Sequence, residues 1–136
     1  MNLKGKIAVV TGGSSGIGRA ISTALASEGC KVVFTYNSNE KGADETLSEL
    51  GENGAKFKMD LHSEEEMTSL FNFVKEKFGK LDILVNNAGI NRPSELFDTN
   101  VWREMFEVDL FSVVFCTGKA VELMGDGGMI LNISSI

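Results

Sequence analysis

One glycine-rich segment constrains this chain more than any other feature: Thr11-Gly12-Gly13-Ser14-Ser15-Gly16-Ile17-Gly18. The β-branched run before it, Lys6–Val10, predicts a buried parallel strand. After it, apolar residues recur with helical spacing and predict a helix from Ile17 to Glu28; they are Ile17, Ala20, Ile21, Ala24 and Leu25. A glycine turn between a strand and a helix offers backbone N–H groups and the positive helix end to an anion. The segment therefore predicts a phosphate-binding turn of a dinucleotide site.

Strand and helix patterns alternate along the rest of the chain. Further strands are predicted at Lys31–Tyr36, Ala55–Met59, Leu81–Val85 and Met129–Ile133. Helices are predicted over Lys41–Leu50, from Ser63 to Gly79 and from Asn100 to Met124. This alternation predicts an α/β fold, a doubly wound parallel sheet with strand order 3-2-1-4-5 and its switch point between the first and fourth strands.

Two of these helices carry more detailed signals. Ser63 and Glu66 have the spacing of a capping box, which predicts the start of the helix that ends at Gly79. Its core-facing residues are predicted to be Met67, Leu70, Phe71, Val74 and Phe78. The helix from Asn100 to Met124 is predicted to turn its large apolar residues inward, namely Trp102, Met105, Phe106, Leu110, Val113 and Val121.

Size and charge restrict the class of protein and its partners. The 136 residues, 43% of them hydrophobic, suit a single domain over residues 1–136, or the larger part of one that is incomplete at its carboxyl end. A net charge of −6 argues against nucleic acid or an anionic membrane as partner, and no apolar run approaches the roughly 20 residues of a membrane span. Cys30 and Cys116 predict free thiols in a reducing cytoplasm. His62 is the only histidine, so no recognisable zinc site is present.

Polar motifs follow three of the later strands: Asp60-Leu61, Asn86-Asn87-Ala88-Gly89 and Asn132-Ile133-Ser134-Ser135. Together with the spacing within Thr11–Gly18 and with Trp102, they make the chain resemble the short-chain dehydrogenase/reductase family from Gly5 onward. It looks most like the β-ketoacyl carrier-protein reductases. The resemblance implies a Rossmann fold and hydride transfer between NADPH and a carbonyl substrate, either a small molecule or an acyl group bound to a carrier protein.

The resemblance also implies roles for individual residues in cofactor binding. It places the pyrophosphate against Gly12, Gly13, Ser14, Ser15, Gly16, Ile17 and Gly18. Asp60 and Leu61 would hold the adenine, with the carboxylate accepting from its amino group; a helix-capping Asp60 is the alternative. Asn87, Ala88 and Gly89 would lie along the ribose and also stabilise the sheet.

The preference between NADP and NAD depends on the segment Thr35-Tyr36-Asn37-Ser38-Asn39. Enzymes that select NAD usually place an acid about 20 residues past the glycines, where it binds the ribose 2′-hydroxyl. No acid is present here, and Asn37 stands near that position, which favours NADP. NAD stays the alternative, because Ser15 occupies the place where many NADP-users carry a basic residue.

The catalytic residues implied by the resemblance are Ser135, which would hydrogen-bond the substrate oxygen, and Asp109, which stands where the family usually has an asparagine. Ser135 could alternatively cap a following helix. The family's acid is a tyrosine with a lysine four residues later, and the pair would follow Ser135 by about a dozen residues. The only tyrosine here is Tyr36, with Glu40 four residues on. The chain is therefore expected to be inactive alone.

Three interpretations of the whole chain follow. It is the amino-terminal part of a longer reductase, a natural short form that binds nucleotide without catalysis, or an interaction module on the same fold. A sheet that stops after its fifth strand, Met129–Ile133, would expose a core strand as an edge. Phe111, Val114 and Phe115 also lie outside the predicted inward face of their helix. Both features predict a homo-oligomer.

Overall fold

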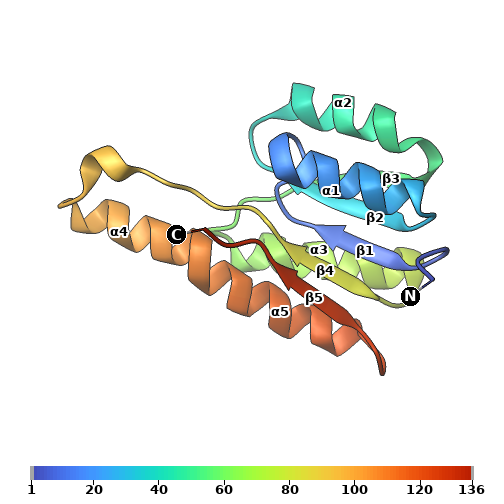
Figure 1. Cartoon of the computed structure of the whole chain (residues 1–136). Coiled ribbons are helices and arrows are strands. Elements are labelled where there is room, and N and C mark those ends of the chain that lie inside the picture. The colour runs from blue at the N-terminus through green and yellow to red at the C-terminus, as the bar shows by residue number, and fades with distance from the viewer. Residues whose placement is uncertain (1, 136) are drawn as a thin grey trace.

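The computed structural model describes residues 2–135, which form one parallel five-stranded sheet with helices on both faces (Figure 1). The spatial order is β3-β2-β1-β4-β5, which confirms the predicted doubly wound order. Every neighbouring pair of strands is parallel. The strands are β1 (Ile7–Val10), β2 (Lys31–Tyr36), β3 (Gly54–Lys58), β4 (Ile83–Asn86) and β5 (Met129–Asn132).

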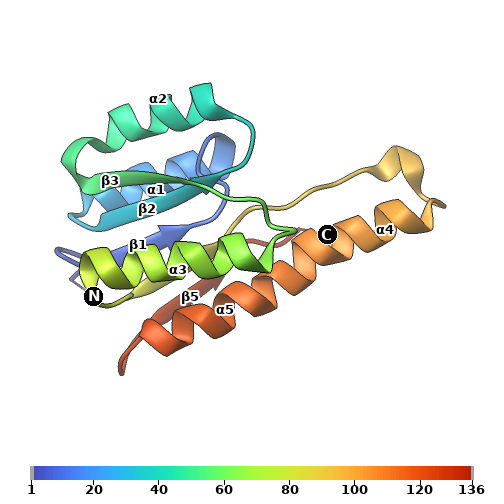
Figure 2. The same cartoon turned by 180° about the vertical axis from the view of Figure 1, so that it is seen from behind.

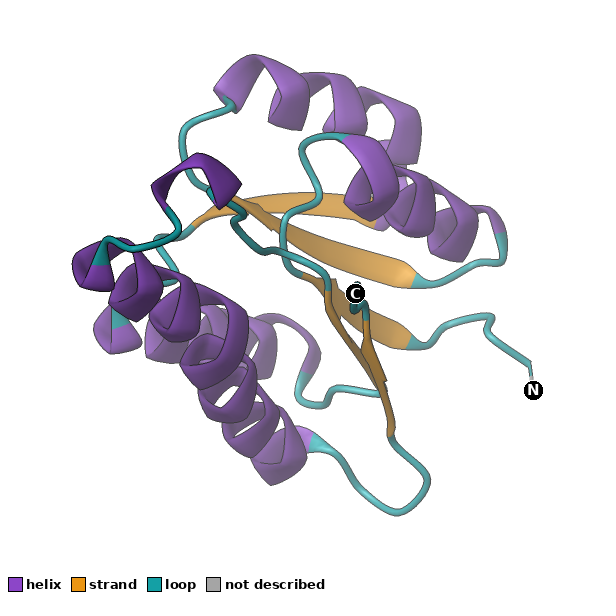
Figure 3. Cartoon of the chain, turned by 60° about the vertical axis from the view of Figure 1, so that its left-hand side comes forward, coloured by secondary structure: helices purple, strands orange, loops and turns teal. Residues whose placement is uncertain are grey.

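Two helical layers sandwich the sheet (Figure 3). Helices α1 (Gly16–Ser27) and α2 (Glu40–Leu50) cover one face, and α3 (Glu64–Phe78) and α5 (Ser112–Leu123) cover the other (Figure 2). Ile7 and Val9 of β1 enter the core on the α3 and α5 side, whereas Ala8 and Val10 enter the core on the α1 and α2 side. Because both faces are covered, both alternating sets of strand side chains are apolar.

Helix α3 follows its sequence prediction closely. The Ser63 hydroxyl accepts from the Glu66 N–H at 3.1 Å, and Gly79 ends the helix with φ +75°. Only half of the capping box forms, because the Glu66 carboxylate accepts from the Asp60 N–H instead of the Ser63 N–H. The predicted core residues Met67, Leu70, Phe71 and Val74 are buried, and Phe78 packs against them.

The apolar face predicted for α1 is confirmed only in part. Ile21 and Leu25 are half-buried and pack against the core, whereas Ala20 and Ala24 are exposed. Ile17 is 62% exposed, and the buried residues of the helix are Gly18, Ser22 and Ala26. These positions are spaced by four and lie on one face of the helix. The first turn of α1 packs directly on the Gly12 carbonyl through Gly18, which has no side chain to hold the helix away. That close approach fixes which face points inward and leaves Ile17 outside the core.

The helix predicted from Asn100 to Met124 is three helical segments with a different inward face. They are α4 (Thr99–Phe106), a π-helical segment (Glu107–Phe111) and α5. Four of the residues predicted to face inward are 41–55% exposed; they are Trp102, Phe106, Leu110 and Val121. Met105 and Val113 are half-buried. The buried positions are instead Val101, Val108, Ser112, Cys116 and Ala120.

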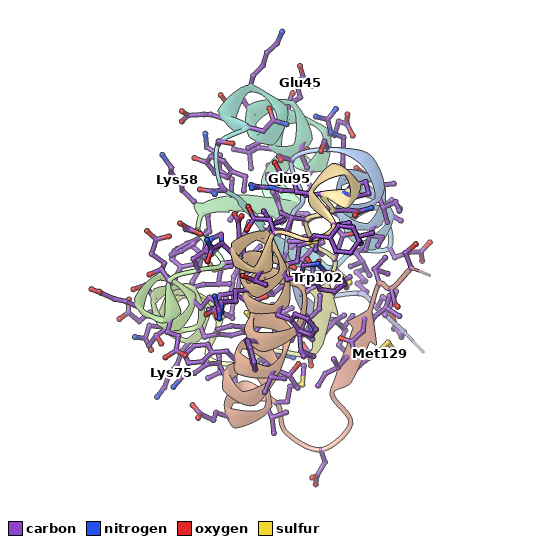
Figure 4. The ribbon with its side chains drawn as sticks, turned by 90° about the vertical axis from the view of Figure 1, so that its left-hand side faces the viewer. Glu45, Lys58, Lys75, Glu95, Trp102 and Met129 are labelled. Atoms are coloured by element: carbon purple, nitrogen blue, oxygen red, sulfur yellow. The ribbon has the colours of Figure 1, made fainter. Side chains whose placement is uncertain are left out.

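The local geometry explains this correction. A π-helical turn holds more residues than an α-helical turn, so the helical periodicity shifts across the segment. α5 then meets α3 through small side chains, with Cys116 Sγ 3.5 Å from Met67 Sδ. α4 extends past the sheet (Figures 1 and 2). Figure 4 faces this exposed end, where Trp102 is labelled.

Strand β5 does not have the buried environment expected of a core strand. Met129, Ile130 and Leu131 are 42%, 36% and 45% exposed. The strand is the last of the sheet and pairs with β4 alone. Between residues 2 and 135, no helix is both long and apolar enough to cross a membrane.

Candidate functional site

The site forms at the carboxyl edge of the sheet, where the chain leaves β1 and β4 toward opposite faces. The two strands are neighbours, with Val10 level with Val85. α1 follows β1 over one face, whereas the α4–α5 segment follows β4 over the other (Figure 1). In a doubly wound sheet, the crevice at this switch point is where ligands bind.

Hydrogen bonds lock the turns after β1 and β4 to each other. The buried Thr11 hydroxyl accepts from the N–H groups of Asn87 at 3.0 Å and Ala88 at 3.1 Å. The Asn87 amide donates to the carbonyls of Thr11 at 3.0 Å and Gly12 at 3.1 Å. The glycine turn and the Asn87–Gly89 segment are therefore one rigid unit. Sequence reasoning missed this role of Thr11. A threonine at the end of a buried strand could have indicated that its hydroxyl binds a neighbouring turn.

The four predicted glycines have distinct roles. A side chain at Gly13 would collide with Phe34, and one at Gly18 would overlap the Gly12 carbonyl. Gly12 has φ +70° and packs against Ala88. Gly16 has φ +53° and faces open space. Three of these glycines permit close packing, and Gly16 leaves room for another molecule to approach the backbone.

Helix α1 starts without a side-chain cap, unlike α2, α3 and α4. Ser15 is its N-cap residue, and within the described part of the chain no side chain accepts from its first N–H groups. The N-caps of α2, α3 and α4 each accept such a hydrogen bond. Uncapped N–H groups at a helix start attract an anion. Gly16 and the exposed Ser15 lie at this end of the helix.

A cavity of about 180 Å³ lies between the glycine turn and the ends of β2 and β3. Its walls include five of the predicted cofactor residues and their neighbours Tyr36 and His62; the five are Gly12, Ser14, Asn37, Asp60 and Leu61. Two further predicted residues, Ala88 and Gly89, close it on the β4 side.

Asp60 is held in a tight turn with His62. Its Oδ1 accepts from the His62 N–H at 2.9 Å and lies 2.7 Å from His62 Nδ1. The hydrogen bonds from the His62 backbone and ring hold the pKa of the Asp60 carboxyl below its ordinary value. Ser63, and not Asp60, is the N-cap of α3. The structure therefore disfavours the helix-capping alternative for Asp60.

A larger cavity of about 740 Å³ opens on the other side of the same segment. Ala88, Gly89 and Ile90 line both cavities, so the two cavities adjoin at this segment. We call the two adjoining cavities together the trough. The larger cavity brings together predicted residues from four parts of the chain, namely Ile17, Asn87, Asp109 and Ser135. Asn132 and Ser134 complete its wall at the end of β5.

Asp109 connects the π-helical segment to the turn after β4. Its Oδ1 accepts from the Ile90 N–H at 2.8 Å, and a Cβ added to Gly89 would lie 3.0 Å from the same oxygen. Asp109 therefore positions the wall that the two cavities share. Although Asp109 lies on a helix with an apolar stripe, its carboxylate is exposed and lines the large cavity.

Some predicted residues lie outside both cavities. Gly13 and Gly18 are buried in packing contacts, and Ser15 and Gly16 are exposed at the start of α1. Tyr36 lines the small cavity, whereas Ser135 lines the large one. The single tyrosine therefore lies apart from Ser135.

The described residues hold no cluster of three or more His, Cys, Asp or Glu side chains that could bind a metal ion. Both cysteines are buried free thiols. Burial raises the pKa of the Cys116 thiol to about 12.

Arg19 is a site residue that sequence reasoning missed. Its guanidinium donates to the Ser14 carbonyl at 2.8 Å, the Gly42 carbonyl at 3.0 Å and the Thr46 hydroxyl at 3.0 Å. It thereby ties the glycine turn to α2. A basic residue in the first turn of a helix is unfavourable for the helix dipole. Its presence at position 19 could therefore have indicated from the sequence that the side chain has a specific partner.

Sequence reasoning also missed Glu104, which ties α4 to neighbouring segments of the chain. Glu104 pairs with Arg92 at 2.9 Å and lies 3.6 Å from His62 Nε2. Through His62, this group also reaches Asp60.

The sheet order and the glycine turn that is hydrogen-bonded to Asn87 define a doubly wound, Rossmann-type protein. Its ligand crevice lies at the switch point of the sheet. Comparison with known proteins narrows the class. The family model for short chain dehydrogenase matches residues 6–136. The chain belongs to that family.

Relatives from several sources match nearly the whole chain. The 3-oxoacyl-(acyl-carrier-protein) reductase FabG of Vibrio cholerae is 39% identical over 100% of this chain and 57% of its own length. The 3beta-hydroxysteroid dehydrogenase of Mediterraneibacter gnavus is 39% identical over 96% of this chain and 50% of its own length. A solved short-chain dehydrogenase/reductase from Serratia marcescens superposes with a TM-score of 0.89 at 38% identity, over 99% of this chain and 57% of that one. The chain thus spans about half the length of these relatives.

Proposed function

We propose that this chain is the dinucleotide-binding part of an NADP-dependent carbonyl reductase, with one NADP(H) molecule lying along the trough. The adenosine end would occupy the small cavity, beside Asn37, Asp60 and Leu61. The nicotinamide end would occupy the large cavity, beside Asn87 and Ser135. The observation that carries this proposal is that the two cavities adjoin at one segment, since Ala88, Gly89 and Ile90 line both.

The residues present fit such a ligand. The uncapped start of α1 and the open face of Gly16 suit a pyrophosphate. Asp60 has hydrogen-bonding capacity for an adenine amino group, because a carboxylate can accept at several lone pairs. Ile17 is exposed toward the large cavity, where an apolar side chain can contact a nicotinamide ring.

The end of β2 supports NADP over NAD. Asn37 is exposed, lines the small cavity and carries no charge that would repel a 2′-phosphate. The nearest acid along the chain, Glu40, lies 3.7 Å from the Lys56 ammonium, which offsets part of its charge.

A single substitution tests this preference. Asn37→Asp places a carboxylate where it would bind a 2′-hydroxyl and repel a 2′-phosphate. We expect calorimetric titration to show tighter binding of NADPH than NADH to the natural chain, and a reversal of that order in Asn37→Asp. Asn39→Asp is no suitable control, because Asn39 caps α2; Asn72→Asp, on the exposed face of α3, adds the same charge away from the cavity. Tighter NADH binding to the natural chain would overturn the NADP assignment.

When bound, a reduced nicotinamide would supply the hydride needed to reduce the carbonyl of a small-molecule or carrier-bound 3-oxoacyl substrate. The Ser135 hydroxyl would hold the carbonyl oxygen, and Asp109 would position the wall beside it. Proton donation to that oxygen needs an acid, and Tyr36 lies on the other cavity. General acid–base assistance is worth roughly 10²–10⁴-fold in rate, so we propose that the 136 residues alone bind nucleotide without measurable turnover.

A further inference from the structure

We propose that Asp109 makes the large cavity favour the oxidised, positively charged nicotinamide over the reduced, neutral one. This inference rests on the proposed function, because it assumes that the nicotinamide end of the nucleotide lies in that cavity. It concerns a position at which this chain departs from the resemblance, since an aspartate stands where the family usually has an asparagine.

Asp109 is the only charged side chain among the described residues that line the large cavity. The remaining lining residues are apolar or carry amides and hydroxyls, and they include Asn87, Met105, Val113 and Ser134. No lysine or arginine of this described wall offsets the carboxylate. Any ligand group that enters the cavity therefore meets one uncompensated negative charge.

The charge of Asp109 is not needed for its structural role. Its Oδ1 accepts one backbone hydrogen bond from Ile90, at 2.8 Å. An asparagine oxygen could accept the same bond without any charge. Substituting asparagine therefore separates the electrostatic effect of this residue from its positioning of the Ile90 segment.

Electrostatics gives the direction and size of the effect. The two redox forms of the nucleotide share their phosphates and adenosine, and they differ by one positive charge on the nicotinamide ring. Contributions from the shared parts cancel in the ratio of their dissociation constants, so the ratio reports the field at the ring. For a carboxylate several ångströms away in a water-accessible cavity, Coulomb's law predicts a shift of about threefold to tenfold.

The test is the ratio of the dissociation constants for NADPH and NADP⁺, measured by calorimetry on the 136-residue chain at low salt. We expect Asp109→Asn to lower this ratio by about threefold to tenfold, through weaker binding of NADP⁺. Asp126→Asn is the matched control, because Asp126 lies exposed in the turn before β5 and lines neither cavity. Its ratio should equal that of the natural chain.

A second measurement needs no variant. Added salt screens charges in contact with water, with a Debye length of about 10 Å at 0.1 M and about 3 Å at 1 M. The preference of the natural chain for NADP⁺ should therefore weaken as salt is raised. A ratio that Asp109→Asn leaves unchanged, or a ratio insensitive to salt if the variant does not fold, overturns the inference. Absence of binding of both nucleotides to the natural chain would instead overturn the proposed function.

Discussion

Gly16 is the residue on which the proposed ligand site depends most. Its φ of +53° suits glycine, and its missing side chain leaves open space at the uncapped start of α1. The other glycines of the turn, Gly12, Gly13 and Gly18, contact protein atoms and were predictable only as part of a spacing pattern. Sequence alone could not separate the two roles, because both require the same residue type.

Replacing Gly16 with valine tests that distinction. The branched side chain would stand where the pyrophosphate is proposed to approach, so NADPH binding should fall by at least about a hundredfold, the loss of roughly 3 kcal/mol of charge-assisted hydrogen bonds. Titration calorimetry measures the affinity. Gly127→Val is the matched control, because Gly127 also has positive φ and open space but lies in the turn before β5. Unchanged affinity in a folded Gly16→Val chain would remove the glycine turn from the site.

Asp82 links two central strands and makes stability depend on pH. Burial alone would raise the pKa of its carboxyl, but hydrogen bonds from the Ile7 N–H at 2.8 Å and from Lys80, with the nearby Lys6 charge, hold that pKa below its ordinary value. A lowered pKa in the fold means that the ionised form stabilises the protein above the unfolded pKa of about 4. This contribution is lost as the pH falls through the folded pKa.

We therefore expect Asp82→Asn to lower the free energy of unfolding by about 1 kcal/mol at pH 7, since it removes two partly screened ion pairs. The difference from the natural chain should shrink toward zero as the pH falls below about 3. Urea unfolding at both pH values measures it, with Asp126→Asn as the exposed control. A difference independent of pH would contradict the ionic origin of the effect.

At the scale of single elements, the strands were more predictable than the helices. β1 and β2 are buried on both faces, and strands of this kind appear in the sequence as uninterrupted apolar runs. A run such as Lys6–Val10 is therefore readily assigned to a buried strand. The π-helical segment Glu107–Phe111 has no comparable local signal, and it moved the inward face of α5 to small residues such as Cys116 and Ala120. Which face of α1 is buried was likewise decided by tertiary contact at Gly18, outside the reach of periodicity.

The exposed side of the α4–α5 segment predicts self-association. Large apolar residues there are 41–63% exposed; they are Trp102, Phe106, Leu110, Phe111, Val114 and Val121. β5 adds three exposed apolar residues at a sheet edge. Sedimentation over a wide concentration range should show dimers or larger species. Phe106→Glu with Phe111→Glu should raise the dissociation constant by at least about tenfold, whereas Ala24→Glu on exposed α1 should not. A monomer at all concentrations would contradict this prediction.

At the scale of the whole molecule, the sheet order, the glycine turn and the grouping of polar residues at one sheet edge could be predicted, because parallel strands end at the same edge. The trough itself could not. Its shape depends on the hydrogen bonds between Thr11 and Asn87, between Arg19 and Ser14, and between Asp109 and Ile90. Each of these bonds joins two different segments of the chain, and a local sequence pattern does not predict such contacts. The central claim is that one dinucleotide spans both ends of this trough.

Amide chemical shifts, measured by NMR during a titration with NADPH, test that claim most directly. We expect the amides of Asn37 and Asp60 at the small cavity, and of Asn87 and Ser135 at the large one, to shift together. They should saturate with one common dissociation constant, together with Gly16 between them. Shifts confined to one cavity, two different dissociation constants, or no saturable shift at all would contradict the account.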